Sequence, residues 1–157
     1  MNAVVVRATP ESVPRLVASA TSLFAEDGAL RDPWMDLTWP HREGPAYYAD
    51  LAHRSDSLCL LALSAAGSAI GHLIGRTRRA DPLRPGAVVG ALESMRVDPA
   101  HRGTGVGTAL ADEFFAWARE FGANQVSVTA YATNDSAIRF YRGRGFTPFE
   151  LALHAPV

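Results

Sequence analysis

The residues with the clearest chemical potential are three glycines at alternate positions, 103, 105 and 107, in the segment RGTGVGT at 102–108. This segment joins a β-branched run to an apolar helical pattern. Such a junction leaves backbone N–H groups without intrahelical partners, with the positive end of the helix dipole behind them. Glycines allow the positive φ angles of the turn and let an anion such as a pyrophosphate approach the backbone.

Taken alone, this glycine pattern is also compatible with a flexible strand-to-helix turn. Two better-known phosphate loops are excluded, because the segment lacks the Gly-Lys-Ser/Thr ending of nucleoside triphosphatases and the G-x-G-x-x-G of dinucleotide folds. The pattern therefore indicates an anion site of another kind.

The elements around this turn follow from the spacing of apolar residues. Period-two or continuous apolar runs predict strands, and 3.6-residue spacing predicts helices that Gly28 and Gly122 terminate. The expected order is β-α-α-β-β-β-α-β-α-β, an α+β fold whose mostly antiparallel sheet has helices on both faces. The expected strands are 3–8, 58–64, 69–77, 87–97, 125–131 and 146–154, and the expected helices are about 10–26, 45–54, 106–121 and 134–142.

Length and composition limit the class of protein. The 157 residues predict one domain, 1–157, and the net charge of -1 argues against a nucleic-acid partner. No apolar run approaches the roughly 18 to 20 residues of a membrane span, and the start lacks a signal-peptide pattern, so we expect a cytoplasmic protein without a membrane partner. Cys59, in an apolar run, is interpreted as structural, and no metal site is expected.

Two blocks of residues together resemble a known family. The segment V97-D98-P99-x-x-R102-G103-x-G105-V106-G107-x-x-L110 is similar to the acetyl-CoA signature of the GNAT superfamily of N-acetyltransferases. N134-D135-x-A137-I138-R139-F140-Y141-x-x-x-G145-F146 resembles a second block of that family at the usual distance. The resemblance covers roughly residues 88–150 and implies a GNAT-like fold, with acetyl-CoA as cosubstrate.

The resemblance also implies which residues bind this cosubstrate. Backbone amides of the turn would hold the pyrophosphate, and the preceding strand would place Met95 and Val97 beside the pantetheine arm. In the family this strand usually carries a bulge, which the sequence does not reveal. The residues of the turn to which the role carries over are Arg102, Gly103, Thr104, Gly105, Val106, Gly107 and Thr108.

Tyr141 matches the tyrosine that in many family members protonates the departing CoA thiolate. A phenol with a pKa near 10 can donate a proton to a thiolate of pKa ~8.5 within hydrogen-bond reach. The alternative is a tyrosine that only packs on an amphipathic helix. Asn134 lies seven residues earlier and can face the same site, contributing to cofactor binding, or cap the helix; the two interpretations are compatible.

Glu93 matches a glutamate that serves several family members as general base. Strand alternation places it on the side of Met95 and Val97, opposite Ser94 and Arg96. A carboxylate there would take the proton that an amine must lose before it attacks a thioester. A solvated or salt-bridged strand residue is the alternative, and His72 is the second candidate for the base.

The acceptor is the least determined part of the prediction. Residues 24–54 contain six acids, whose charge would favour a cationic amine. The aromatic residues of this region would either provide apolar or cation–π walls for the amine or fill the core; they are Trp34, Trp39, Tyr47 and Tyr48. The hypothesis is a small cationic amine; a protein N-terminus or lysine, or a non-catalytic acyl-CoA sensor, are the alternatives. A basic stretch would reach the 3′-phosphate or lie in a solvated loop; it consists of Arg76, Arg78, Arg79 and Arg84. A homodimer paired through ELALH, 150–154, is also expected.

Overall fold

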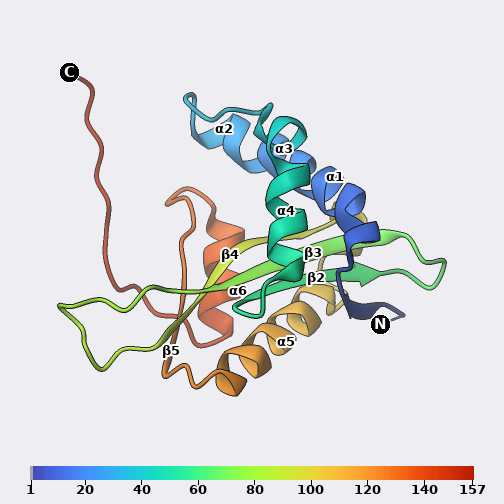
Figure 1. Cartoon of the computed structure of the whole chain (residues 1–157). Coiled ribbons are helices and arrows are strands. Elements are labelled where there is room, and N and C mark those ends of the chain that lie inside the picture. The colour runs from blue at the N-terminus through green and yellow to red at the C-terminus, as the bar shows by residue number, and fades with distance from the viewer. Residues whose placement is uncertain (1) are drawn as a thin grey trace.

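The computed structural model describes residues 2–157 and contains one five-stranded sheet in the order β1-β2-β3-β4-β5. The first four strands are antiparallel neighbours, and β5 pairs with β4 in parallel (Figure 1). The strands are β1 (Val4–Arg7), β2 (Ser57–Leu63), β3 (Ala69–Thr77), β4 (Val89–Val97) and β5 (Gln125–Val128). The α-helices are α1 (Val13–Leu23), α2 (Ala29–Arg31), α3 (Trp39–Arg42), α4 (Gly44–His53), α5 (Val106–Glu120) and α6 (Asp135–Gly143).

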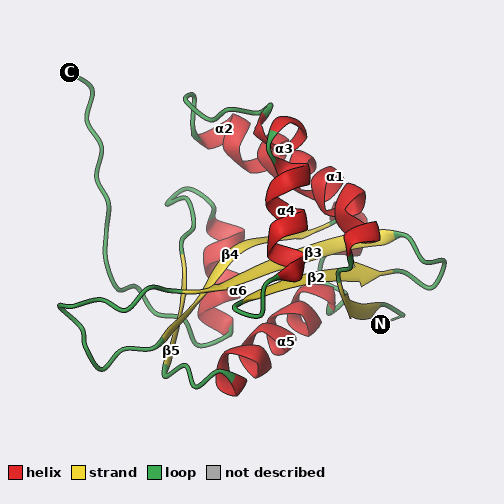
Figure 2. Cartoon of the chain, in the orientation of Figure 1, coloured by secondary structure: helices red, strands yellow, loops and turns green. Residues whose placement is uncertain are grey.

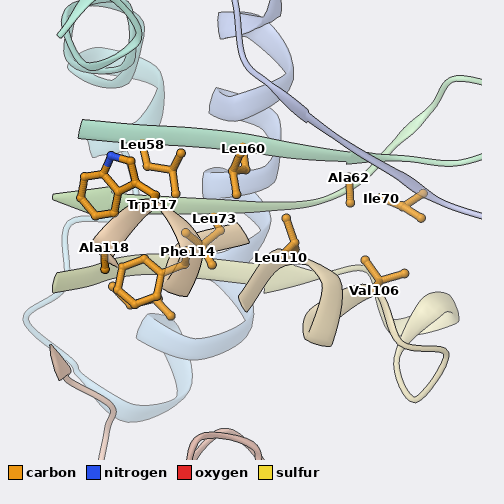
Figure 3. Close-up of a cluster of buried hydrophobic side chains, with 11 residues drawn as sticks. Leu58, Leu60, Ala62, Ile70, Leu73, Val106, Leu110, Phe114, Trp117 and Ala118 are labelled. Atoms are coloured by element: carbon orange, nitrogen blue, oxygen red, sulfur yellow. The ribbon is translucent and has the colours of Figure 1, made fainter. Parts of the chain in front are cut away.

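Helices cover both faces of this sheet (Figure 2). On one face, α5 packs the apolar side chains of its 3.6-residue pattern against β2, β3 and β4. Figure 3 shows Leu110, Phe114 and Trp117 of α5 pointing toward the sheet. On the other face, α1 and α4 bury a second cluster that includes Leu16, Leu51 and Cys59. The predicted fold class, with its mixed sheet and helices on both faces, is confirmed.

Helix α1 does not end as an ordinary α-helix. It continues directly into a π-helix at Phe24–Gly28, which leads into the short helix α2. A π-helix has i→i+5 hydrogen bonds, one residue longer than those of an α-helix, and this rare type often occurs at functional sites. It contains the adjacent acids Glu26 and Asp27, which contact different parts of the chain. Glu26 accepts from Arg96 of β4, and Asp27 accepts from Asn134 at the start of α6.

Strand β4 is irregular in a way that its alternation does not reveal. Its register with β3 shifts so that Ile74 pairs with Ser94 and Gly75 with Leu92, which leaves Glu93 as an unpaired bulge residue. On the other side, pairing with β5 ends at Leu92 and Val128. Within the described part of the chain, the second half of β4 therefore has no neighbouring strand on that side.

The last predicted strand, 146–154, is the part of the expected order that differs. The chain follows the order through α6, but residues 147–157 are extended and form no backbone hydrogen bond within the described chain. Figure 1 shows this segment running away from the sheet. A strand needs a neighbour to pair with, and Pro148 also removes a donor. Among residues 2–157 no helix has the length and apolar character needed to cross a membrane.

Candidate active site

The glycine-rich turn has the free donors that an anion site requires. Gly103 and Gly105 adopt φ angles of 74° and 94°, and Gly105 is the last residue before α5. Within residues 2–157, none of the backbone N–H groups from Gly103 to Thr108 has a hydrogen-bond partner. All of them lie at the positive end of α5, so the turn fits a pyrophosphate group.

Two members of the predicted turn differ from the rest. The N–H of Arg102 already donates to the carbonyl of Pro99 at 3.3 Å, so the free donors begin at Gly103. Gly107 has an ordinary helical φ, and its missing side chain has another cause. A Cβ at Gly107 would lie 3.2 Å from the Cε of Met95, so this glycine lets α5 approach β4 closely.

The unpaired half of β4 lies directly before this turn. Met95 and Val97 are partly buried and pack against the α5 cluster. Their strand has no neighbour beyond Leu92 on the β5 side, which leaves a backbone edge that an extended molecule can pair with. A cosubstrate arm that follows this edge would lead to the free N–H groups of the turn.

Glu93 lies on the other face of the sheet from the one predicted. The bulge breaks the alternation, so Glu93 joins Ser94 and Arg96 on the side of α1 and α4, while Met95 and Val97 face α5. The Tyr47 hydroxyl lies 2.7 Å from both carboxylate oxygens of Glu93. The prediction that Glu93 shares a side with Met95 is therefore wrong, because strand parity does not hold across a bulge.

Arg76 completes the surroundings of Glu93. Its guanidinium donates to the Tyr47 hydroxyl at 3.2 Å and lies 3.7 Å from the Glu93 carboxylate. The role that was considered for Arg76 at the cofactor's 3′-phosphate is not supported, since the side chain points to this group. Burial and the neighbouring Glu93 carboxylate raise the pKa of Tyr47 to about 12, so its hydroxyl stays protonated at neutral pH.

Tyr141 lies on α6 with its ring packed between Phe140 and Phe146, at centroid distances of 5.5 and 5.6 Å. Its hydroxyl has no hydrogen-bond partner among the described residues. Burial, with a smaller contribution from the carboxylate of Asp27, raises the pKa of Tyr141 to about 12. The phenol therefore keeps its proton at neutral pH and has a free donor.

Asn134 caps α6, as one of its two interpretations predicts. Its side-chain oxygen accepts from the N–H of Ala137 at 3.2 Å, and its amide donates to Asp27 of the π-helix at 3.2 Å. Asp27 in turn pairs with Arg31 at 2.8 Å. These contacts hold the start of α6, and thereby Tyr141, against the π-helix.

His72, the second candidate for the base, is enclosed between the two layers. It is 1% exposed, and its Nδ1 and Nε2 atoms lie 2.5 Å from Ser19 Oγ and 2.8 Å from Ser94 Oγ. Burial, with a smaller effect of Arg96, lowers its pKa to about 4. Neither ring nitrogen is free for a substrate, so His72 serves to connect α1, β3 and β4.

The expected acidic rim is largely neutralised by ion pairs. Glu26 bridges Arg96 at 2.7 Å and Arg102 at 2.9 Å, which holds the side chain of Arg102 beside the turn. Hydrogen bonds from Arg96 are the main reason that the pKa of Glu26 is lowered. The remaining acids of residues 24–54 that pair with arginine are Asp27, Asp36, Glu43 and Asp50; Asp32 instead accepts from the hydroxyl of Tyr131 and the N–H of Trp34.

Trp39, Tyr47 and Tyr48 form one aromatic cluster with Phe24. Trp39 stacks on Phe24 at 5.9 Å and meets Tyr47 edge to face at 5.2 Å. Trp34, also considered as a wall of the acceptor site, is 93% exposed and lies outside this cluster. Sequence reasoning missed the contact of Tyr47 with Glu93 and the bridge made by Glu26, because no short-range pattern links residues that are 46 and 70 positions apart.

This fold and site define an acetyl-CoA-dependent N-acetyltransferase. A family model described as "Acetyltransferase (GNAT) family" matches residues 27–146, and the chain belongs to this family. No curated protein sequence matches the chain.

Solved structures share the fold at low sequence identity. The aminoglycoside 6′-N-acetyltransferase AAC(6′)-Ih from Acinetobacter baumannii is 19% identical, with a TM-score of 0.74 over 99% of this chain and 97% of that one. AAC(6′)-IG from Acinetobacter haemolyticus is 24% identical, with a TM-score of 0.76 over 98% and 97%. A transcriptional regulator from Bacillus halodurans C-125 is 19% identical, with a TM-score of 0.75 over 99% of each chain.

The environment of His72 predicts a dependence of stability on pH. In the unfolded chain the imidazole binds a proton below its ordinary pKa of 6.5, but in the folded protein only below about 4. Stability is therefore full above pH 6.5 and falls as the pH approaches 4, by about 3 kcal/mol from this group. Thermal unfolding of His72→Gln between pH 7 and 4 should show a smaller loss of Tm than wild type; equal slopes would contradict the assignment.

Proposed function

We propose that the protein, as a single domain over residues 1–157, transfers the acetyl group of acetyl-CoA to the primary amine of a small cationic molecule. The observation that carries this proposal is the run of free N–H groups from Gly103 to Thr108, beside the unpaired half of β4. The names of two similar structures, both aminoglycoside N-acetyltransferases, support an amine acceptor. The proposal includes a cytoplasmic location.

In this proposal the backbone of the turn and of β4 at Met95 and Val97 binds the cosubstrate, with Asn134 at the start of α6. Acetyl-CoA supplies a thioester, whose carbonyl carbon the amine attacks. Glu93 accepts a proton from the attacking amine, and Tyr47 and Arg76 hold its carboxylate in place. Tyr141 gives its proton to the departing thiolate, which forms the CoA thiol while the new amide keeps the acetyl group.

A screen for CoA release tests the proposal. Purified protein with acetyl-CoA is offered small amines, aminoglycosides and peptide N-termini, and free thiol is followed over time. Thiol release with amines of low mass supports the proposal. Release with peptides alone would favour a protein acceptor, and tight CoA binding without release from any acceptor would favour a sensor.

Replacement of Tyr141 by Phe removes the proposed acid without changing the ring packing. We expect kcat to fall about 100-fold, the range for loss of a general acid, with little change in the Kd of acetyl-CoA. Tyr48→Phe is the matched control, since Tyr48 is only 4% exposed and out of reach of a substrate. Unchanged turnover in Tyr141→Phe would remove Tyr141 from the mechanism.

Replacement of Glu93 by Gln retains the shape of the side chain but removes its basicity. We expect kcat/KM for the amine to fall about 100-fold, with part of the loss recovered at high pH because more of the amine is then already deprotonated. The control is Glu113→Gln, an exposed residue on α5. A variant as active as wild type at pH 7 would exclude Glu93 as the base.

We also propose a homodimer that pairs through the C-terminal segment. Phe149, Leu151 and Leu153 alternate along this segment and are 75, 76 and 83% exposed, which is unusual for large apolar side chains on an extended backbone. Light scattering after size exclusion should give about twice the 16.8 kDa of one chain. The double variant Leu151→Asp/Leu153→Asp should be monomeric, and Leu30→Asp, an exposed residue of the short helix α2, should remain dimeric. A monomeric wild type contradicts the proposal.

A further inference from the structure

A pocket of about 450 Å³ opens at the start of α4 and is lined by Trp39, Glu43, Ala46 and Tyr47. Three of these residues follow the spacing i, i+3 and i+4, which places them on one face of α4. Trp39 comes from α3, directly before this helix (Figure 1). The small side chain of Ala46 leaves the space between the aromatic rings and the carboxylate open.

The aromatic side of this pocket is held rigidly. The rings of Trp39 and Tyr47 meet edge to face at 5.2 Å, and each also contacts the buried Tyr48, at 6.2 and 5.3 Å. Because Tyr48 is 4% exposed, it fixes the two outer rings from behind. A rigid pair of aromatic faces attracts an organic cation through the ring quadrupoles and loses little entropy on binding it.

The carboxylate of Glu43 has no hydrogen bond within residues 2–157 and only one long ion pair, so it can bind a cation. Glu43 precedes α4, yet its side chain does not cap the helix, and no hydrogen bond within residues 2–157 engages its oxygens. Its nearest charge, Arg42, lies 3.9 Å away and is already engaged with Asp36 at 2.5 Å. Glu43 is also the acid that lines the pocket, so it is placed to meet a ligand there.

Tyr47 connects this pocket to the proposed base. Its ring forms a wall of the pocket, while its hydroxyl lies 2.7 Å from both oxygens of Glu93. Tyr47 thus borders both the pocket that Glu43 lines and the carboxylate of Glu93. Two carboxylates that border the same residue match two cationic groups of one elongated molecule.

We propose that the pocket formed by Trp39, Glu43 and Tyr47 binds a second ammonium group of the acceptor, while the amine to be acetylated lies at Glu93. The inference rests on the proposed acetyltransferase function and narrows its acceptor to alkyl diamines and polyamines. The bound ammonium is not acetylated; it orients the molecule so that its other end reaches the thioester. Monoamines of the same length lack this contact and bind more weakly.

Two ligands of equal carbon chain length test this inference, 1,4-diaminobutane and butylamine. Calorimetric titration of the protein saturated with CoA measures binding, and CoA release from acetyl-CoA measures turnover. We expect wild type to prefer the diamine by about tenfold or more in both measurements, the scale of one cation–π contact with an added charge pair. Glu43→Gln and Trp39→Leu should each reduce this preference several-fold, and Ala46→Leu should reduce it by filling the pocket.

Asp50→Asn provides the matched control. It makes the same change of charge on the same helix, but Asp50 lies outside the pocket. The inference is overturned if wild type binds both amines equally, if it binds neither, or if Asp50→Asn lowers the preference as much as Glu43→Gln does. Acetylation of both amines without preference overturns the pocket alone, whereas diamine-selective binding without any CoA release overturns the enzyme proposal alone.

Discussion

The bulge at Glu93 is the constraint on which the arrangement of the site depends. One unpaired residue in β4 reverses the side-chain alternation, so Leu92 and Met95 both face α5 while Glu93 and Ser94 both face the opposite layer. The same irregularity coincides with the end of pairing to β5. A regular strand would continue the ladder and leave no free backbone edge before the glycine turn.

Charge pairing then connects this strand to the layer above it. Arg96 is 9% exposed at its side chain, and a buried guanidinium requires partners, which Glu26 and Asp98 provide. Glu26 also reaches Arg102, so the acid serves two cations at once. Glu26 of the π-helix therefore holds both Arg102 of the anion-binding turn and Arg96 near the end of β4.

Much of the fold was predictable because it depends on local periodicity. The apolar spacing of α5 and the continuous apolar runs of β2 and β3 determine their faces without reference to the rest of the chain. The glycine turn was recognisable for the same reason, since its residues are contiguous. The face of the sheet on which Glu93 lies could not be predicted, because a bulge is a property of the register between two strands. The strand expected at 146–154 has the right alternation but no neighbour among residues 2–157 to pair with.

The candidate site was predictable only as far as its motifs extend. Positions in the turn, Asn134 and Tyr141 lie within two short blocks, whereas Tyr47 and Glu26 acquire their partners through tertiary contacts. Whether the acids in residues 24–54 form ion pairs also depends on the tertiary structure, since a count of charges does not reveal which acids lie close to an arginine. The place of Glu43 in the lining of a pocket likewise became visible only in the folded chain.

The π-helix at Phe24–Gly28 has a consequence for how this chain can vary. Its extra residue rotates everything that follows by about a quarter of a turn or more relative to α1, and Glu26 and Asp27 point to different elements because of it. Single substitutions preserve this rotation, but the loss of one residue would restore a continuous α-helix and move both carboxylates away from Arg96 and Asn134 together. Substitution and deletion are therefore unequal here: the length of this segment is constrained more tightly than its composition.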